Sequence, residues 1–216
     1  MSPVAFVLVS STVAFLIGGI PFGYLMGRLV LKDDIRRHGS GNIGATNVGR
    51  VIGWKWGGLV LLLDALKGLL PTLGTWLMST NRVSHEWAGH AIVAAGMSAI
   101  LGHMYPVYLK LRGGKGVATA MGVVLILAPA AMGIALVIFV VTLITDRRMA
   151  LASMLAAVAF GVAHLTLEGK AAWTAAATSR TAFAVAVPLL IIWRHRANIR
   201  RMLSGTEPKV SEKTDS

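Results

Sequence analysis

The stretch MSPVAFVLVSSTVAFLIGGIPFGYLMG, from Met1 to Gly27, contains no charged residue. It is too long for the apolar core of a signal peptide and no basic region precedes it, so we expect a retained membrane span. About 20 helical residues cross a hydrocarbon layer of about 30 Å, which allows similar charge-poor stretches to be counted along the chain. This first stretch therefore predicts a membrane protein.

The composition of the whole chain supports the same class of protein. Of its 216 residues, 55% are hydrophobic and only 14% are charged, and the mean hydropathy is +0.68. A soluble globule of this size needs more charged side chains on its surface. The net charge of +12 would indicate nucleic acid binding in a soluble protein, but in a membrane protein it is typical of cytoplasmic loops. Cysteine is absent, which excludes disulfides and thiolate chemistry.

Further charge-poor stretches predict the remaining spans, which are Trp56–Thr80, Trp87–Leu109, Met149–Leu167 and Thr181–Trp193. Asp64 and Lys67 interrupt the first of these, but their spacing of three lets them pair on one helix face, and we expect a structural pair. The uncharged range Val117–Thr145 would form a helix of about 43 Å, which is long for one span. Pro129 lies near its middle and predicts two shorter helices.

Two helices in that range give seven spans, and the basic residues then divide unequally between the two sides. Seventeen of the 21 Lys and Arg fall on one side, whereas the other receives Arg82, Lys170 and Arg180. By the positive-inside rule we predict an all-α, polytopic protein with seven transmembrane helices, some short, an outside N-terminus and a cytoplasmic C-terminus. We expect one membrane domain over residues 1–203 and a polar, mobile tail over residues 204–216.

Glycines and polar residues alternate in the first loop on the basic side, GSGNIGATNVGR, which runs from Gly39 to Arg50. Its hydrogen-bonding side chains are Ser40, Asn42, Thr46, Asn47 and Arg50. Glycines allow backbone N–H groups to point toward one centre, which suits a phosphate. The alternative is a plain glycine-rich turn between helices.

A second loop, GHMYPVYLKLRGGKGVAT, runs from Gly102 to Thr119 and surrounds Lys115 with glycines before a predicted helix. Backbone amides and a lysine at a helix N-terminus are typical of a phosphate site. The spacing does not match a nucleotide-binding P-loop, because Leu109 replaces its first glycine and Gly116 its Ser or Thr. We expect Lys110 and Arg112 to be interface anchors.

The third segment, RHRANIRRMLSGTE, follows the last span from Arg194 to Glu207. A basic cluster after a span is most often a topology anchor or a contact to anionic lipid. His195 differs, because imidazole can act as a base or hold a hydroxyl near neutral pH. If the helix continues, Asn198 and Arg201 share its face, and we expect Glu207 to order the tail. The histidines lack ligand spacing with Asp or Glu, so no metal is predicted.

These three motifs, in this order, resemble the signature of the bacterial acyl phosphate:glycerol-3-phosphate acyltransferases, which are small membrane enzymes that begin phospholipid synthesis. The Leu63–Gly68 stretch LDALKG is similar to the family as well. Ile43 and Tyr105 stand where members often carry Pro and Phe, which leaves the resemblance intact. The His-x-x-x-x-Asp signature of the acyl-CoA-dependent enzymes is absent from this sequence.

The resemblance implies acyl transfer from a fatty acyl phosphate to the 1-hydroxyl of sn-glycerol 3-phosphate at the cytoplasmic face of the inner membrane. It implies the catalytic residues Ser40, Arg50, Lys115 and His195. It also implies the substrate-binding residues Asn42, Thr46, Asn47, Gly102, His103, Gly113, Gly114, Gly116, Thr119 and Asn198. An acyl phosphate is already activated, so no cofactor, nucleotide or metal is expected.

Two other classes of protein stay open at this point. A transporter or channel for an organic phosphate would also use basic glycine loops, but transporters usually bind substrate near the membrane midplane. A structural lipid-binding protein would leave the first two loops without a role. Either the donor phosphate or His195 takes the proton of the attacking hydroxyl, and the sequence leaves this alternative undecided.

Overall fold

Long helices occupy the charge-poor stretches of the chain in the computed structural model, which describes residues 1–210. They are α1 (Pro3–Gly18), α4 (Trp54–Ser79), α5 (His85–Met104), α7 (Pro129–Asp146), α8 (Met149–Glu168) and α9 (Thr178–Arg194). Within the described residues, six segments are long and apolar enough to cross a membrane, and α6 (Val117–Leu127) is a shorter apolar helix. The protein is therefore an all-helical, multi-pass membrane protein, as predicted.

Short elements connect these helices. They are α2 (Phe22–Met26), a π-helical turn (Gly27–Leu31), α3 (Ala45–Ile52), α10 (Arg196–Leu203) and the 3-10 turns Ile35–Arg37, Val107–Leu109, Gly169–Trp173 and Ala175–Ala177. No β-strand occurs within residues 1–210. The motifs that the sequence singles out lie mainly in and around these short elements.

The first predicted span, Met1–Gly27, overlaps a candidate membrane span, Pro3–Leu31, and its helix is broken near the middle. Helix α1 ends at Gly18 and α2 begins only at Phe22. Pro21 lies between them and has no N–H to continue the hydrogen-bond ladder. Lys67 of α4 donates its Nζ to the carbonyl oxygen of Ile20 at 2.7 Å and so satisfies a backbone group at the break.

The predicted division of the range Val117–Thr145 is confirmed. Helix α6 ends at Leu127, Ala128 adopts a non-helical conformation, and Pro129 is the first residue of α7. At 1.5 Å per residue, α6 is about 16 Å long and reaches only about halfway through a hydrocarbon layer.

Glycines bring helices α1, α4, α5 and α6, which form one group, into close backbone contact. A Cβ on Gly102 of α5 would overlap the carbonyl oxygen of Phe15 in α1, and one on Gly122 of α6 would overlap that of Ala65 in α4. Small residues are typical of membrane helix interfaces, because close backbone approach replaces the hydrophobic driving force that lipid removes. Helix α8 packs against both α7 and α9, and these three helices form a second group.

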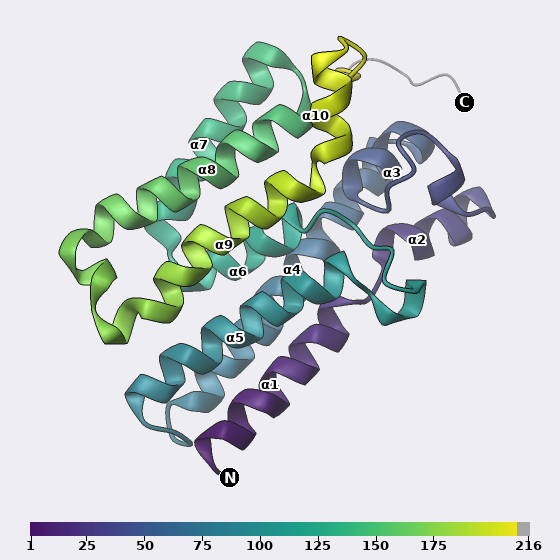
Figure 1. Cartoon of the computed structure of the whole chain (residues 1–216). Helices are drawn as coiled ribbons and strands as arrows, with labels where there is room; N and C mark the ends of the chain where they lie inside the picture. The colour runs from purple at the N-terminus through teal and green to yellow at the C-terminus, as the bar shows by residue number, and fades with distance from the viewer. Residues whose placement is uncertain (211–216) are drawn as a thin grey trace.

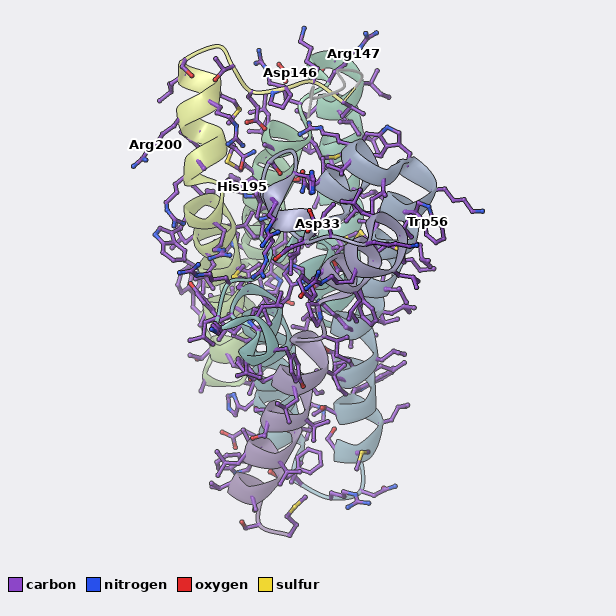
Figure 2. All side chains as sticks on the ribbon, turned by 90° about the vertical axis from the view of Figure 1, so that its right-hand side faces the viewer. Asp33, Trp56, Asp146, Arg147, His195 and Arg200 are labelled. Carbon is purple, nitrogen blue, oxygen red and sulfur yellow. The ribbon has the colours of Figure 1, made fainter. Side chains whose placement is uncertain are left out.

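The N-terminus, the α4–α5 connection and the α8–α9 connection lie at one end of the molecule, whereas α3 and α10 lie at the other (Figure 1). Figure 2 shows Arg147 and Arg200 at the periphery of this second end, while His195 lies farther inside. The polar motifs therefore gather at one end, between the two helix groups.

Candidate active site

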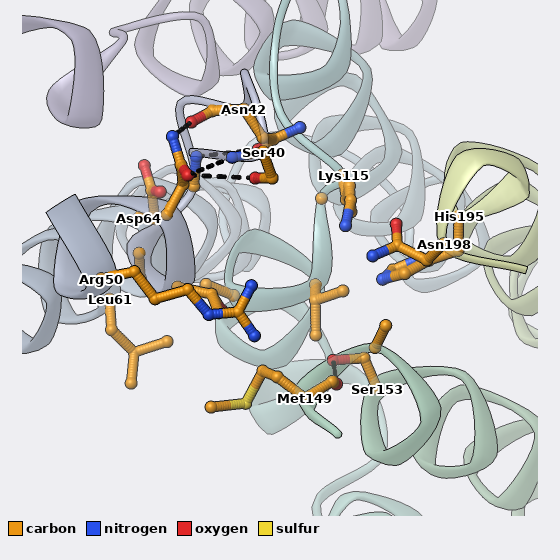
Figure 3. A pocket seen from close by; sticks show the side chains of 18 of the residues that line it. Ser40, Asn42, Arg50, Leu61, Asp64, Lys115, Met149, Ser153, His195 and Asn198 are labelled. Atoms are coloured by element: carbon orange, nitrogen blue, oxygen red, sulfur yellow. Dashed lines mark hydrogen bonds between the residues drawn. The ribbon is translucent and has the colours of Figure 1, made fainter. Parts of the chain in front are cut away.

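Residues from all three motifs line one polar pocket. The sequence-predicted site residues in its lining are Ser40, Asn42, Thr46, Asn47, Arg50, His103, Lys115, Gly116, His195 and Asn198. Figure 3 shows Arg50 and Asn198 pointing into this space from opposite sides, with Lys115 between them. The fold thus brings together segments that are far apart in the sequence.

Asn47 organises the first loop from inside. Its Oδ1 accepts hydrogen bonds from the backbone N–H of Ser40 at 2.8 Å and from the Ser40 hydroxyl at 3.1 Å. Its Nδ2 donates to the carbonyl oxygens of Ile35, His38 and Asn42. Because both ends of this buried amide are occupied, Asn47 shapes the loop and presents Ser40 to the pocket.

The backbone of the same loop turns at glycines. Gly39 and Gly41 adopt φ angles of +57° and +69°, in the region that favours glycine. The Oδ1 of Asn42 accepts a hydrogen bond from the Gly44 N–H at 2.8 Å, just before α3 begins. The loop is thus fixed by its own hydrogen bonds before any ligand binds.

Arg50 extends from α3 and ties the C-terminal segment to the site. Its Nη2 donates to the carbonyl oxygen of Pro208 at 3.0 Å, and the N–H of Val210 donates to the carbonyl oxygen of Arg147 at 2.8 Å. The predicted tail begins at Ser204, and among its described residues Pro208 and Val210 make these two contacts. The rest of that predicted tail, residues 211–216, lies outside the described residues.

Lys115 stands where the second loop meets the N-terminus of α6. Gly116, with a φ of +85°, turns the chain into the helix, and Val117 and Ala118 of its first turn also line the pocket. The first amides of a helix have no partner within the helix and favour an anion. Burial lowers the pKa of Lys115 to about 8; Glu207 opposes this shift, and neighbouring arginines add to it. The ammonium is mostly charged at neutral pH.

His195 interrupts the helix between α9 and α10 and is 2% exposed. Its Nδ1 lies 2.8 Å from the carbonyl oxygen of Ile191. A carbonyl only accepts, so Nδ1 carries the hydrogen and Nε2 of the neutral ring is an acceptor. Burial lowers the pKa of His195 to about 4, and the charges of Lys115 and Arg194 add to that effect. The ring is therefore neutral at physiological pH.

Glu207 joins the third motif to the pocket. Its Oε1 accepts from Nδ2 of Asn198 at 2.7 Å, and its Oε2 accepts from Nε of Arg201 at 2.8 Å. This confirms the expectation that Glu207 orders the segment after α10. The amide of Asn198 is thereby oriented, and its buried Oδ1 makes no hydrogen bond within residues 1–210. That oxygen is available to a hydroxyl donor in the pocket.

A buried ion pair lies beneath the polar pocket. Lys67 Nζ is 2.9 Å from Oδ1 of Asp64, and both residues are 2% exposed, which confirms the predicted pairing. The same carboxylate oxygen is 3.6 Å from Nδ1 of His103, and Asp64 itself lines the pocket. The ion pair therefore adjoins the polar pocket, which Asp64 and His103 both line.

Four predicted substrate-binding residues do not line the pocket in the described structure: Gly102, Gly113, Gly114 and Thr119. Gly102 packs on α1, and Thr119 is fully buried against Gly68 of α4. A Cβ on Gly113 would overlap the carbonyl oxygen of His103, and one on Gly114 its imidazole. The structure gives these residues packing contacts around the site, and their contact with substrate stays a prediction.

An apolar cavity continues from the polar pocket. The residues that line both spaces are Leu61, Val117, Ala118, Phe139 and Ser153. Farther from the polar end, the cavity is lined by side chains such as Val124, Met132 and Phe160. Leu61 and Leu136 line it while remaining 46% and 47% exposed, so it also opens toward the lipid-facing surface.

Some lining residues carry no signal that sequence reasoning used. The spacing of Asp64 and Lys67 predicts a structural pair, although an ionisable residue within a span is a functional candidate by default. Ser153, whose hydroxyl donates to the carbonyl oxygen of Met149 at 2.8 Å, sits among apolar residues and has no motif around it. Only the fold places Ser153 where the polar and apolar spaces meet.

The fold and the pocket define a class of protein: a multi-pass membrane protein whose glycine-rich loops line a polar pocket next to an apolar cavity. The model of the glycerol-3-phosphate acyltransferase family matches residues 8–205. Glycerol-3-phosphate acyltransferases of Myxococcus xanthus and Listeria monocytogenes are 44% and 40% identical to the chain. These matches cover 89% and 93% of this chain and 94% of each relative. The chain belongs to the glycerol-3-phosphate acyltransferase family.

Solved structures agree with this assignment. The chain is similar to PlsY (YgiH), an integral membrane glycerol 3-phosphate acyltransferase, in its glycerol 3-phosphate form, with a TM-score of 0.82 and 36% identity over 94% of both chains. The lysophosphatidic acid form of PlsY gives a TM-score of 0.78 at the same identity and coverage. The protein is accordingly an acyltransferase with a role in phospholipid biosynthesis.

Proposed function

We propose that the protein transfers a fatty acyl group from an acyl phosphate to the 1-hydroxyl of sn-glycerol 3-phosphate. The hydroxyl oxygen forms a bond to the acyl carbonyl carbon, and the bond from that carbon to the phosphate oxygen breaks. The products are 1-acyl-sn-glycerol 3-phosphate, which is lysophosphatidic acid, and inorganic phosphate. No nucleotide or coenzyme A takes part.

The continuity of the two spaces supports this proposal most directly. A fatty acyl phosphate has a charged head and a long apolar chain, and the polar pocket and apolar cavity share five lining residues. With its head near Lys115 and its chain between α6 and α8, the acyl carbonyl falls near their junction at Ala118 and Ser153. The half-exposed Leu136 marks a side through which a lipid chain passes to the bilayer.

Two loops at one pocket suit two phosphate-bearing substrates. We assign Lys115 and the first turn of α6 to a substrate phosphate, because both amides and positive charge meet there. We assign Arg50 and Ser40 to the charge that develops on the carbonyl and the leaving phosphate during transfer. The names of the solved relatives, which describe glycerol 3-phosphate and lysophosphatidic acid forms, support the acceptor and the product.

His195 and Asn198 are the proposed holders of the glycerol hydroxyls. Nε2 of His195 and Oδ1 of Asn198 are both acceptors, so each suits a hydroxyl donor. Because the pKa of His195 is lowered to about 4, its imidazole is a weak base. The phosphate of the donor lies beside the attacking hydroxyl and carries anionic oxygens at neutral pH, so we propose that it accepts the hydroxyl proton.

The uneven charge of the loops supports a cytoplasmic site. The end of the molecule that carries α3 and α10 also carries the basic motifs, which the positive-inside rule places in the cytoplasm. We therefore propose an inner-membrane protein with its N-terminus outside and its described C-terminal residues inside.

The decisive experiment uses purified full-length protein in lipid nanodiscs, given acyl phosphate and glycerol 3-phosphate without nucleotide or coenzyme A. We expect lysophosphatidic acid and inorganic phosphate in equal amounts. Parallel reactions with acyl-CoA or acyl carrier protein test other donors, and turnover with one of these alone would overturn the proposed donor. Uptake of glycerol 3-phosphate into proteoliposomes, without acyl transfer by the folded protein, would favour a transporter.

A further inference from the structure

Arg194, the last residue of α9, reaches across to the loop that carries Lys115. Its Nε donates to the carbonyl oxygen of Gly114 at 3.1 Å, and its Nη2 donates to the same oxygen at 2.8 Å. Nη2 also donates to the carbonyl oxygen of Gly113 at 2.9 Å. The guanidinium lies over the ring of Tyr105, with 5.4 Å between its Cζ and the ring centroid. One side chain thus contacts two successive peptide groups.

The N–H groups of the same two glycines are held by the end of α5. The N–H of Gly113 donates to the carbonyl oxygen of Met104 at 3.2 Å, and that of Gly114 donates to the carbonyl oxygen of His103 at 3.1 Å. The N–H groups of Gly113 and Gly114 therefore bond to α5, and their carbonyl oxygens bond to Arg194. Lys115 is the next residue, so these contacts set where its side chain starts.

We propose that Arg194 is a positioning residue that couples two segments of the active site: the loop that carries Lys115 and the segment that carries His195. It holds Gly113 and Gly114 in the loop of Lys115, and the next residue in the chain is His195. The expected effect of Arg194 on acyl transfer rests on the proposed function, but the hydrogen bonds of Arg194 are present without substrate. Arg194 itself does not line the polar pocket.

The contacts of Arg194 differ from those of an ordinary interface anchor. Arg196, two residues farther along, is exposed, lies over the ring of Trp193 at 4.8 Å from Cζ to the centroid, and bonds only locally. A topology anchor needs a positive charge at the membrane surface, whereas two carbonyl oxygens need the planar fork of a guanidinium. The conservative change Arg194→Lys therefore distinguishes the two roles.

The test compares Arg194→Lys and Arg194→Gln with the matched control Arg196→Gln in full-length protein in nanodiscs. We expect both Arg194 variants to lose about tenfold to a hundredfold in kcat/KM for glycerol 3-phosphate, because the loop of Lys115 is misplaced. The Arg196 variant should stay near the wild-type value. Wild-type kinetics of Arg194→Lys would overturn the proposal, since that variant keeps the charge.

Hydrogen exchange provides a readout that needs no turnover. The amides of Gly113 and Gly114 should exchange faster in both Arg194 variants than in wild-type protein, while those in the middle of α5 stay unchanged. Unchanged exchange at these two glycines would overturn the proposal even if activity falls. The two proposals fail separately. If the wild-type protein does not use acyl phosphate, the proposed function is wrong, but faster exchange at the two glycines in the Arg194 variants would still support the positioning role.

Discussion

The hydrogen-bond partner of His195 limits what its imidazole does in the reaction. With Nδ1 directed at the Ile191 carbonyl and the pKa lowered to about 4, the ring is neutral above about pH 5 and offers Nε2 as an acceptor. We expect His195→Gln to retain the wild-type pH profile between about pH 6 and pH 8, with less than the roughly hundredfold loss typical of a missing base. Steady-state rates across this range give the answer.

The matched control for that experiment is His90→Gln, which changes a histidine of α5 that lies outside the pocket lining. Its rates should equal those of the wild type. If His195→Gln loses a titration limb near neutral pH and falls by several orders of magnitude, His195 is the base after all and the donor phosphate is not.

Lys115 is expected to govern the alkaline side of substrate binding. Its pKa is lowered to about 8, so free enzyme loses the ammonium as pH rises through that value, and KM for the phosphate substrate that it binds should then rise. A bound dianion favours the charged form, so kcat at saturation should change less. Arg stays charged at these pH values, so Lys115→Arg should abolish the rise. A wild-type KM that is flat to about pH 9 would contradict this assignment.

The Asp64 and Lys67 ion pair predicts a non-additive effect on stability. Lys67→Met leaves a buried carboxylate without its counterion and should lower the free energy of unfolding by about 3–5 kcal/mol. The double variant Asp64→Asn, Lys67→Met removes both charges and should be more stable than Lys67→Met alone. Denaturant titration of the folded protein in detergent measures both. A double variant that is no more stable than Lys67→Met would contradict the prediction.

At the scale of the elements, helix α8 presents two different faces to its surroundings. Ala157 lines the apolar cavity, one helical turn beyond Ser153, whereas Val158 is 42% exposed on the outer surface. Under the proposed function, Ala157→Phe should fill the cavity and lower kcat/KM for long-chain acyl phosphates more than for short-chain ones. Val158→Phe adds the same ring to the same helix and should leave the ratio of kcat/KM for long-chain to short-chain acyl phosphates unchanged. Equal ratios in both variants would place the acyl chain elsewhere.

The sequence predicts most elements because charge and proline act locally. A charge-poor stretch forms a helix wherever it lies in the membrane, and Pro129 ends a hydrogen-bond ladder whatever its neighbours are. The break before α2 is not predicted, because the apolar pattern runs through Pro21 without change. The Ile20 carbonyl at this break accepts from Lys67, which is distant in sequence, as well as from the nearby Phe22 N–H.

The site is predicted less completely, because several of its contacts join residues that are distant in sequence. Motifs identify residues such as Lys115 whose chemistry is local, but they do not separate a glycine near a phosphate from one that packs on a side chain. Gly114 lies against the imidazole of His103, and this contact depends on how α5 and the loop meet. Likewise, nothing around Ser153 indicates that it stands where the polar pocket meets the apolar cavity.

At the scale of the whole molecule, the distribution of charge predicts its orientation. Asn81 and Lys170 are exposed in the connections at the N-terminal end, while Arg147 and Arg200 are exposed at the end that carries α10. The chain has no cysteine, so a single cysteine introduced at any of these positions is labelled without background. With a membrane-impermeant thiol reagent on spheroplasts, Asn81→Cys and Lys170→Cys should react at once, because the positive-inside rule places them outside. Arg147→Cys and Arg200→Cys should react only after permeabilisation, and the opposite pattern would overturn the proposed topology and with it the cytoplasmic site.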